Sequence, residues 1–73
     1  MKLLLLDSAG GSRVDTEMQA VPRVGDELFV ARADGDRGFY RVTAVQFAAY
    51  ENGVPPESEH VAKLLIERVQ LPG

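Results

Sequence analysis

Few residues of this chain have the types and spacing that catalysis or metal binding requires. His60 is the only histidine and there is no cysteine, so neither a two-histidine site nor a thiolate site can hold a metal within one chain. No serine lies in the G-x-S-x-G motif of a nucleophile elbow. His60 adjoins the longest irregular segment, where we expect a surface position. The sequence therefore predicts no catalytic residue, no metal and no cofactor.

Asp34 and Asp36 have the spacing that opens a calcium-binding loop. Counting Asp34 as the first position of such a loop, Phe39 stands at the sixth, where glycine is needed, and Val45 stands at the twelfth, where glutamate is needed. The two carboxylates are therefore expected to stabilise a turn rather than to bind a metal.

Three arginines, Arg32, Arg37 and Arg41, surround one predicted hairpin, with Phe39 and Tyr40 between them. Interleaved arginine and aromatic side chains bind single-stranded nucleic acid in some β-barrels, through phosphate contacts and base stacking. The formal net charge of −3 opposes broad phosphate binding, and carboxylates close to the hairpin are nearer partners for the arginines. Nucleic-acid binding is therefore the alternative prediction for function and not the favoured one.

A turn near the middle of the chain organises the predicted fold. Pro22 fixes φ and cannot donate a ladder hydrogen bond, so a preceding strand should end there. Gly25 can take a positive φ without steric cost. The Asp26 carboxylate can accept hydrogen bonds from nearby backbone N–H groups. We expect Pro22, Gly25 and Asp26 to have a structural role.

Apolar residues recur with strand periodicity over four segments. A continuous apolar run at Lys2–Asp7 predicts a buried strand, and alternation along Arg13–Val21 predicts a half-buried one. Glu27–Ala33 and Phe39–Tyr50 are the next two strands. The apolar stripe of Phe39–Tyr50 contains one step of three residues, which predicts a β-bulge near Thr43-Ala44. Bulged, bent strands allow a short sheet to curl into a barrel.

The last segment, Glu59–Leu71, is compatible with two structures. A helix over 59–70 would have a single apolar face, formed by Val61, Leu64, Leu65 and Val69. A strand would place Ala62, Leu64 and Ile66 on one face and Val61, Leu65 and Val69 on the other. We favour the strand, because the preceding strand needs an antiparallel partner. The alternative is an α+β fold, with a four-stranded sheet and a C-terminal helix.

Taken as a five-stranded meander, the segments resemble small SH3-like β-barrels. The resemblance rests on Pro22-Arg23-Val24-Gly25-Asp26, then on Leu28 and Val30, and then on Tyr40-Arg41-Val42 with Val45. This is similar to the P-x-x-G-D, then Y-x-V-x-x-V pattern of short uncharacterised bacterial and phage-encoded proteins. The resemblance implies an all-β barrel and a binding role rather than an enzymatic activity.

Length and composition predict one small domain over residues 1–73. Hydrophobic residues make up 45% of the chain, as in ordinary globular proteins. The N-terminal run of four leucines is too short for a signal peptide, and no segment reaches transmembrane length. We therefore expect a cytoplasmic protein with no membrane partner.

The favoured function is a non-enzymatic protein-interaction or structural module without a small-molecule substrate. Two-faced strands leave apolar residues outside a small barrel, and a chain of this size can gain burial from a second copy. We therefore expect a homodimer or a protein partner. The predicted interface consists of Phe47, Val61, Leu65 and Val69.

Overall fold

The computed structural model describes residues 1–70, and these residues form five strands and no helix. The strands are β1 (Lys2–Asp7), β2 (Arg13–Glu17), β3 (Glu27–Ala31), β4 (Arg37–Phe47) and β5 (Ala62–Arg68). The prediction of an all-β, five-stranded fold is confirmed. The alternative, a helix over 59–70, is wrong, because β5 runs through this segment and pairs with β4.

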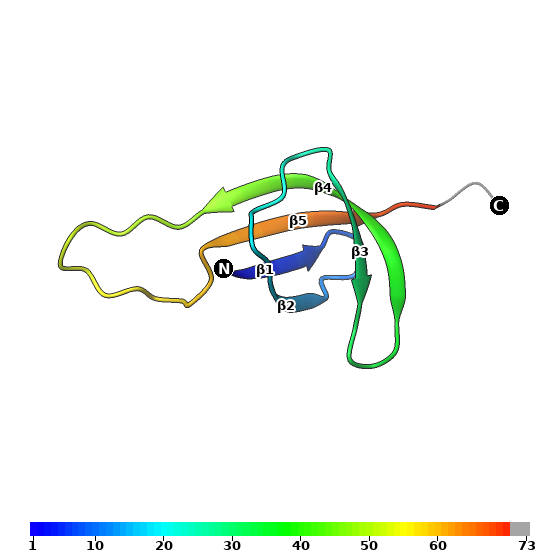
Figure 1. Cartoon of the computed structure of the whole chain (residues 1–73), viewed down its shortest axis with the longest axis horizontal. Helices are drawn as coiled ribbons and strands as arrows, with labels where there is room; N and C mark the ends of the chain where they lie inside the picture. The colour runs from blue at the N-terminus through cyan, green and yellow to red at the C-terminus, as the bar shows by residue number, and fades with distance from the viewer. Residues whose placement is uncertain (71–73) are drawn as a thin grey trace.

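All five strands belong to one sheet with the order β2-β1-β5-β4-β3 (Figure 1). The chain neighbours β1–β2, β3–β4 and β4–β5 are antiparallel, as in a meander. The first and last strands, β1 and β5, are also neighbours and run parallel. The sheet curls into a half-barrel, and its two edges are β2 and β3 (Figure 1).

The core lies on the inner face of the curled sheet. It is built from alternate residues of β1, β3, β4 and β5, as the period of two along a strand requires. Its buried members are Leu3, Leu5, Val30, Tyr40, Val42, Ala62, Leu64 and Ile66. Leu4 points to the other face and is also buried, at 3% exposure, which explains why the apolar run in β1 is continuous.

The predicted bulge in β4 is confirmed. The register between β4 and β5 shifts between Val42 and Ala44, which pair with Ile66 and Leu65 respectively. The extra residue, Thr43, donates a hydrogen bond from Oγ1 to the carbonyl oxygen of Leu65 at 3.2 Å. The shift lets Val42 and Val45 both face the core, although they are three positions apart.

The strand ends differ from the prediction by a few residues. β2 ends at Glu17, and Met1 and Met18 then exchange the terminal hydrogen bonds of the hairpin, at 2.8 and 2.9 Å. β3 and β4 end at Ala31 and Phe47, earlier than predicted. Leu71, the last residue of the predicted fifth strand, lies outside the described residues.

Arg68 covers one end of the core. Its Nη2 donates a hydrogen bond to the carbonyl oxygen of Arg37 at 2.7 Å, and its guanidinium carbon lies 5.7 Å from the centre of the Tyr40 ring. The guanidinium passes so close to Gly38 that a Cβ there would lie 2.7 Å from Nη2. A side chain at position 38 would therefore make the flexible Arg68 guanidinium shift, whereas the φ of Gly38 is not one that demands glycine.

In the turn before β3, Gly25 and Asp26 have the predicted roles, whereas Pro22 does not: the turn spans Arg23–Asp26, Pro22 precedes it, and β2 already ends at Glu17. The Asp26 carboxylate accepts a hydrogen bond from the Arg23 N–H at 2.9 Å, and the Asp26 N–H donates to the Arg23 carbonyl at 3.0 Å. Gly25 has a φ of 95°, a conformation that side chains with a Cβ rarely adopt.

We expect Gly25→Val to lower the free energy of unfolding by about 1–3 kcal/mol. A Cβ at Gly25 would meet no atom within 4 Å, so the loss would come from backbone strain alone. Urea titration of wild type and Gly25→Val measures this loss of free energy of unfolding. Arg23→Ala is the matched control and should leave the urea midpoint unchanged. Arg23 is exposed, and its hydrogen bond in the turn comes from its backbone N–H, which alanine keeps. Equal midpoints for wild type and Gly25→Val would contradict the strain argument.

Candidate functional site

The outer edge of β3 has free backbone hydrogen-bonding groups. β4 covers one side of β3, and within residues 1–70 no strand pairs with the other side. Val42 donates to the Asp26 carbonyl at 2.9 Å, and Arg32 donates to the Asp36 carbonyl at 2.8 Å. Because the ladder alternates, Glu27, Phe29 and Ala31 direct their N–H and C=O groups away from β4.

An open groove of about 370 Å³ lies beside this edge, between β3 and β2. Every Cα of β2 is more than 8 Å from every Cα of β3, whereas paired strands lie about 5 Å apart. Near the end of the groove, the Arg32 Nη2 donates to the Arg13 carbonyl at 3.4 Å. The lining is mixed: it includes the apolar side chains of Leu5, Val14, Met18, Leu28 and Val30, and polar surface makes up as large a share of it. The edge of β3 therefore remains accessible along the groove.

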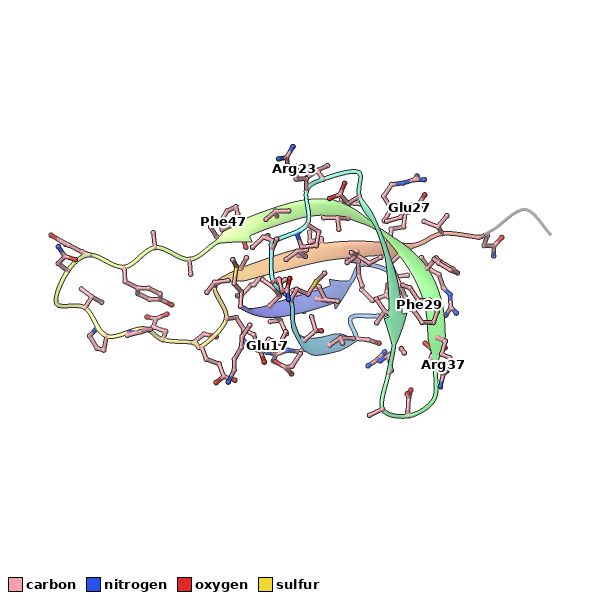
Figure 2. All side chains as sticks on the ribbon, in the orientation of Figure 1. Glu17, Arg23, Glu27, Phe29, Arg37 and Phe47 are labelled. Atoms are coloured by element: carbon pink, nitrogen blue, oxygen red, sulfur yellow. The ribbon has the colours of Figure 1, made fainter. Side chains whose placement is uncertain are left out.

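Two phenylalanines form an exposed pair on the outer face beside the β3 edge. Phe29 and Phe39 are register partners on β3 and β4, and their ring centres are 5.3 Å apart with an interplanar angle of 54°. They are 57% and 40% exposed. Glu27 and Arg37, labelled with Phe29 in Figure 2, lie toward opposite ends of the same hairpin. We call Phe29 and Phe39 the aromatic pair.

The edge of β2 is different in character. The hydrogen bonds from Asp7 to Ser12 and from Met18 to Met1 place the ladder bonds to β1 at even-numbered residues of β2. The backbone groups that point away from β1 therefore belong to Arg13, Asp15 and Glu17, whose charged side chains are all exposed, and of these groups the Arg13 carbonyl accepts the bond from Arg32. Charged residues are a common protection of an edge strand against pairing with another chain.

The structure does not bring the four predicted interface residues into one surface. Phe47 is 70% exposed and pairs in register with the buried Ala62, so it extends the inner face beyond the core. Val61 and Leu65 are 41% and 42% exposed and lie on the outer face of the chain around β5. Val69 is half-buried. The predicted set is therefore split between the two faces of the sheet.

A long connection between β4 and β5 projects away from the half-barrel (Figure 1). Every residue from 47 to 59 is exposed, including the large side chains of Phe47, Tyr50 and Val54. The tip is a turn in which Val54 donates to the Glu51 carbonyl at 3.0 Å and Gly53 has a φ of 93°. We call residues 47–59 the arm.

His60 is not the surface residue that the sequence predicted. Its side chain is only 13% exposed and lies between Ser58 and Asp15. Its Nδ1 is 2.8 Å from the Ser58 hydroxyl, and its Nε2 is 2.5 Å from Asp15 Oδ1. No local pattern around His60 indicates this arrangement, because Asp15 is on β2, far away along the chain.

Ser58, His60 and Asp15 are also the residue types of a catalytic triad. In such a triad the carboxylate is buried and the serine hydroxyl points at the scissile bond. Here Asp15 is 72% exposed, and the Ser58 hydroxyl accepts a hydrogen bond from the His60 backbone N–H at 3.2 Å. The trio therefore attaches the base of the arm to β2, and we assign it a structural role.

A second contact at the base of the arm is exposed. Lys2 Nζ lies 2.9 Å from Glu59 Oε2, and both side chains are more than half exposed. The hydrogen bond from Lys2, together with its positive charge, lowers the pKa of Glu59, and the same hydrogen bond together with the negative charge of Glu59 raises the pKa of Lys2. Solvent screens such a pair, so it adds little to stability.

The three arginines of the alternative prediction are only partly free. Arg41 forms an ion pair with Glu27 at 3.2 Å, and Arg32 donates to the Arg13 carbonyl. Arg37 and Arg41 are register partners of Ala31 and Glu27, so they flank the aromatic pair along β4. This arrangement could stack a base, but a carboxylate neutralises one of the two flanking charges.

Two further kinds of site are absent from the described part of the chain. Residues 1–70 contain no cluster of three His, Asp or Glu side chains that could hold a metal. In the same residues no helix has the length and apolar character to cross a membrane. Comparison with protein-family models, with curated proteins and with solved structures finds no match. The resemblance to SH3-like barrels therefore stays a prediction beyond the all-β fold.

We expect His60→Ala to lower the free energy of unfolding by about 1 kcal/mol, because it removes the half-buried hydrogen-bonded ring that joins the arm to β2. Glu59→Ala is the control, since it removes only the exposed ion pair at the neighbouring position. Urea midpoints for the two variants give the comparison. An equal effect of the two substitutions would show that His60 does not fix the arm.

We expect no saturable binding of a mixed-sequence single-stranded oligonucleotide at micromolar protein and physiological salt. The reason is the net charge of −3 together with the pairing of Arg41 to Glu27. Fluorescence anisotropy tests this, with Arg37→Ala and Arg41→Ala as controls. Salt-dependent binding that both substitutions weaken would instead support nucleic-acid recognition by the aromatic pair and its flanking arginines.

Proposed function

We propose that this protein is a non-enzymatic interaction module that forms a homodimer, and that the free edge of β3 with the aromatic pair is its contact surface. The single observation that supports this most strongly is the coincidence of the two features on one strand. Phe29 belongs both to the free edge and to the exposed aromatic pair.

An unprotected edge strand favours pairing with another strand. Natural proteins usually block such edges with charges, proline, bulges or a covering loop. β3 has one charged residue, Glu27, at its first position, and Phe29 and Ala31 follow with no proline or lysine between. β2 has a charged residue at each edge position. The contrast favours β3, and not β2, as the edge that a partner covers.

Small size adds a driving force for association. A domain of 73 residues buries a smaller fraction of its apolar surface than a larger domain does. Exposed aromatic side chains supply large contact area at low conformational cost and are common anchors of protein interfaces. Covering Phe29 and Phe39 with a second copy would bury apolar surface that one chain alone leaves in water.

We expect the wild-type chain to sediment at equilibrium with twice the mass of one chain at tens of micromolar. The double variant Phe29→Ser/Phe39→Ser should weaken the dimer at least about tenfold, because loss of a central aromatic anchor costs about 2 kcal/mol and about 1.4 kcal/mol corresponds to tenfold in Kd. Phe47→Ser/Tyr50→Ser is the matched control, since it removes two exposed aromatic side chains of the arm.

Three results would contradict this proposal. A monomeric wild type would reject self-association. Equal weakening by the arm variant would move the interface to residues 47–59. Dissociation by Leu65→Lys, with the Phe29/Phe39 variant still dimeric, would place the interface on the outer face at β5. Far-UV circular dichroism of each variant verifies that the sheet is intact.

A further inference from the structure

We infer that the two copies join by antiparallel pairing of β3 with itself, with the two-fold axis at Phe29, so that two half-barrels share one continuous sheet. This inference rests on the proposed function, because it specifies how the proposed dimer is built. A two-fold interface uses the same surface patch on both copies, and β3 offers a patch that is complementary to itself.

The backbone groups select this register. Glu27, Phe29 and Ala31 are the residues of β3 whose N–H and C=O groups are free. With the axis at Phe29, this residue meets its own copy, and Glu27 meets Ala31 of the second copy on each side. Each facing pair can then exchange two hydrogen bonds, as hydrogen-bonded pairs of an antiparallel ladder do. No free group of the strand is left without a partner.

The outer face of this dimer would be aromatic at its centre. Phe29 lies 5.3 Å from Phe39 in one copy, and the axis at Phe29 brings the same pair of the second copy alongside. Four rings would then form a row across the joined sheet. On the inner face, Leu28 would lie opposite Val30 of the second copy, and both are core or core-contacting residues. Apolar side chains therefore meet on both faces.

The charged side chains also favour the register with the axis at Phe29. Glu27 would lie opposite the uncharged Ala31 of the second copy, whose neighbour on β4 is Arg37. The two copies of Glu27 would be separated by the length of the strand, about 13 Å for four residues. If the axis were at Glu27 instead, two carboxylates would face each other directly, which is destabilising. A slip by one residue would place the core residues on the solvent face.

The side of β3 that the second copy would occupy faces an open groove, and the Arg32–Arg13 hydrogen bond at its end would have to open as the strand is added. The groove of about 370 Å³ runs along the side of β3 that the second copy would occupy. Its lining includes Val14, Met18 and Leu28, which are half-buried in the single chain. These side chains would be further covered when the edge is paired. In this arrangement the groove becomes part of the dimer interface.

A coupling between positions 27 and 31 tests the register. Ala31→Lys creates a lysine opposite Glu27 of the second copy at both symmetric positions, and such cross-strand pairs contribute about 0.2–1 kcal/mol each. We expect the dissociation constant to fall about two- to thirtyfold with Ala31→Lys and to rise by a similar factor with Ala31→Glu. The part of each effect that depends on Glu27 should disappear when Glu27→Gln is also present. Both effects should also decline near 1 M salt.

This double-mutant cycle separates the two proposals. Within one chain, Glu27 and position 31 are too far apart to interact through a direct contact, so their coupling can arise only across the dimer. A lysine or glutamate introduced at position 31 also interacts with the neighbouring Arg37. This interaction is present with and without Glu27, so its contribution to the dissociation constant cancels in the cycle. A dimer without coupling would overturn the β3–β3 register and leave self-association in place. A monomeric wild type would overturn both.

Discussion

The structure depends on the burial of β5 between β1 and β4. Leu64 and Ile66 are almost completely buried, and they meet Leu3 and Leu5 on one side and Val42 on the other. This packing requires the first and last strands to lie side by side, which is why they pair in parallel inside an otherwise antiparallel sheet. The β1–β2 and β3–β4 hairpins extend this three-stranded centre in opposite directions. The two outermost strands therefore become free edges.

The two free edges have different chemistry, and this difference supports the proposed function. The edge of β2 carries a charged side chain at each free backbone position, and Asp15 also holds His60 at the base of the arm. The edge of β3 carries Phe29 and Ala31 beside a groove of mixed polar and apolar lining. Water can form hydrogen bonds with the backbone groups and the charged side chains of the β2 edge, so this edge is stable without a partner strand. The second edge exposes apolar surface together with unpaired backbone groups, so it gains more from a partner strand.

Local sequence patterns predicted the features that depend on neighbouring residues. Alternation located the strands, a step of three located the bulge at Thr43, and the turn residues predicted the positive φ of Gly25. Patterns did not reveal the parallel neighbours β1 and β5, the contact of His60 with Asp15, or the pairing of Phe29 with Phe39. Each of these joins residues that are distant along the chain or on different strands. Strand periodicity says which face a residue occupies, and it does not say which strand lies beside it.

The position of Arg68 over Gly38 couples two residues that are far apart in the chain. A side chain at position 38 would have to displace the guanidinium from its present place, and a short side chain at position 68 would remove its contact with the Tyr40 ring. Substitution at one position therefore changes which residues the other position accepts. Among related chains, a residue larger than glycine at position 38 should occur together with a smaller residue at position 68. Such paired variation would indicate the contact between positions 38 and 68 from sequences alone.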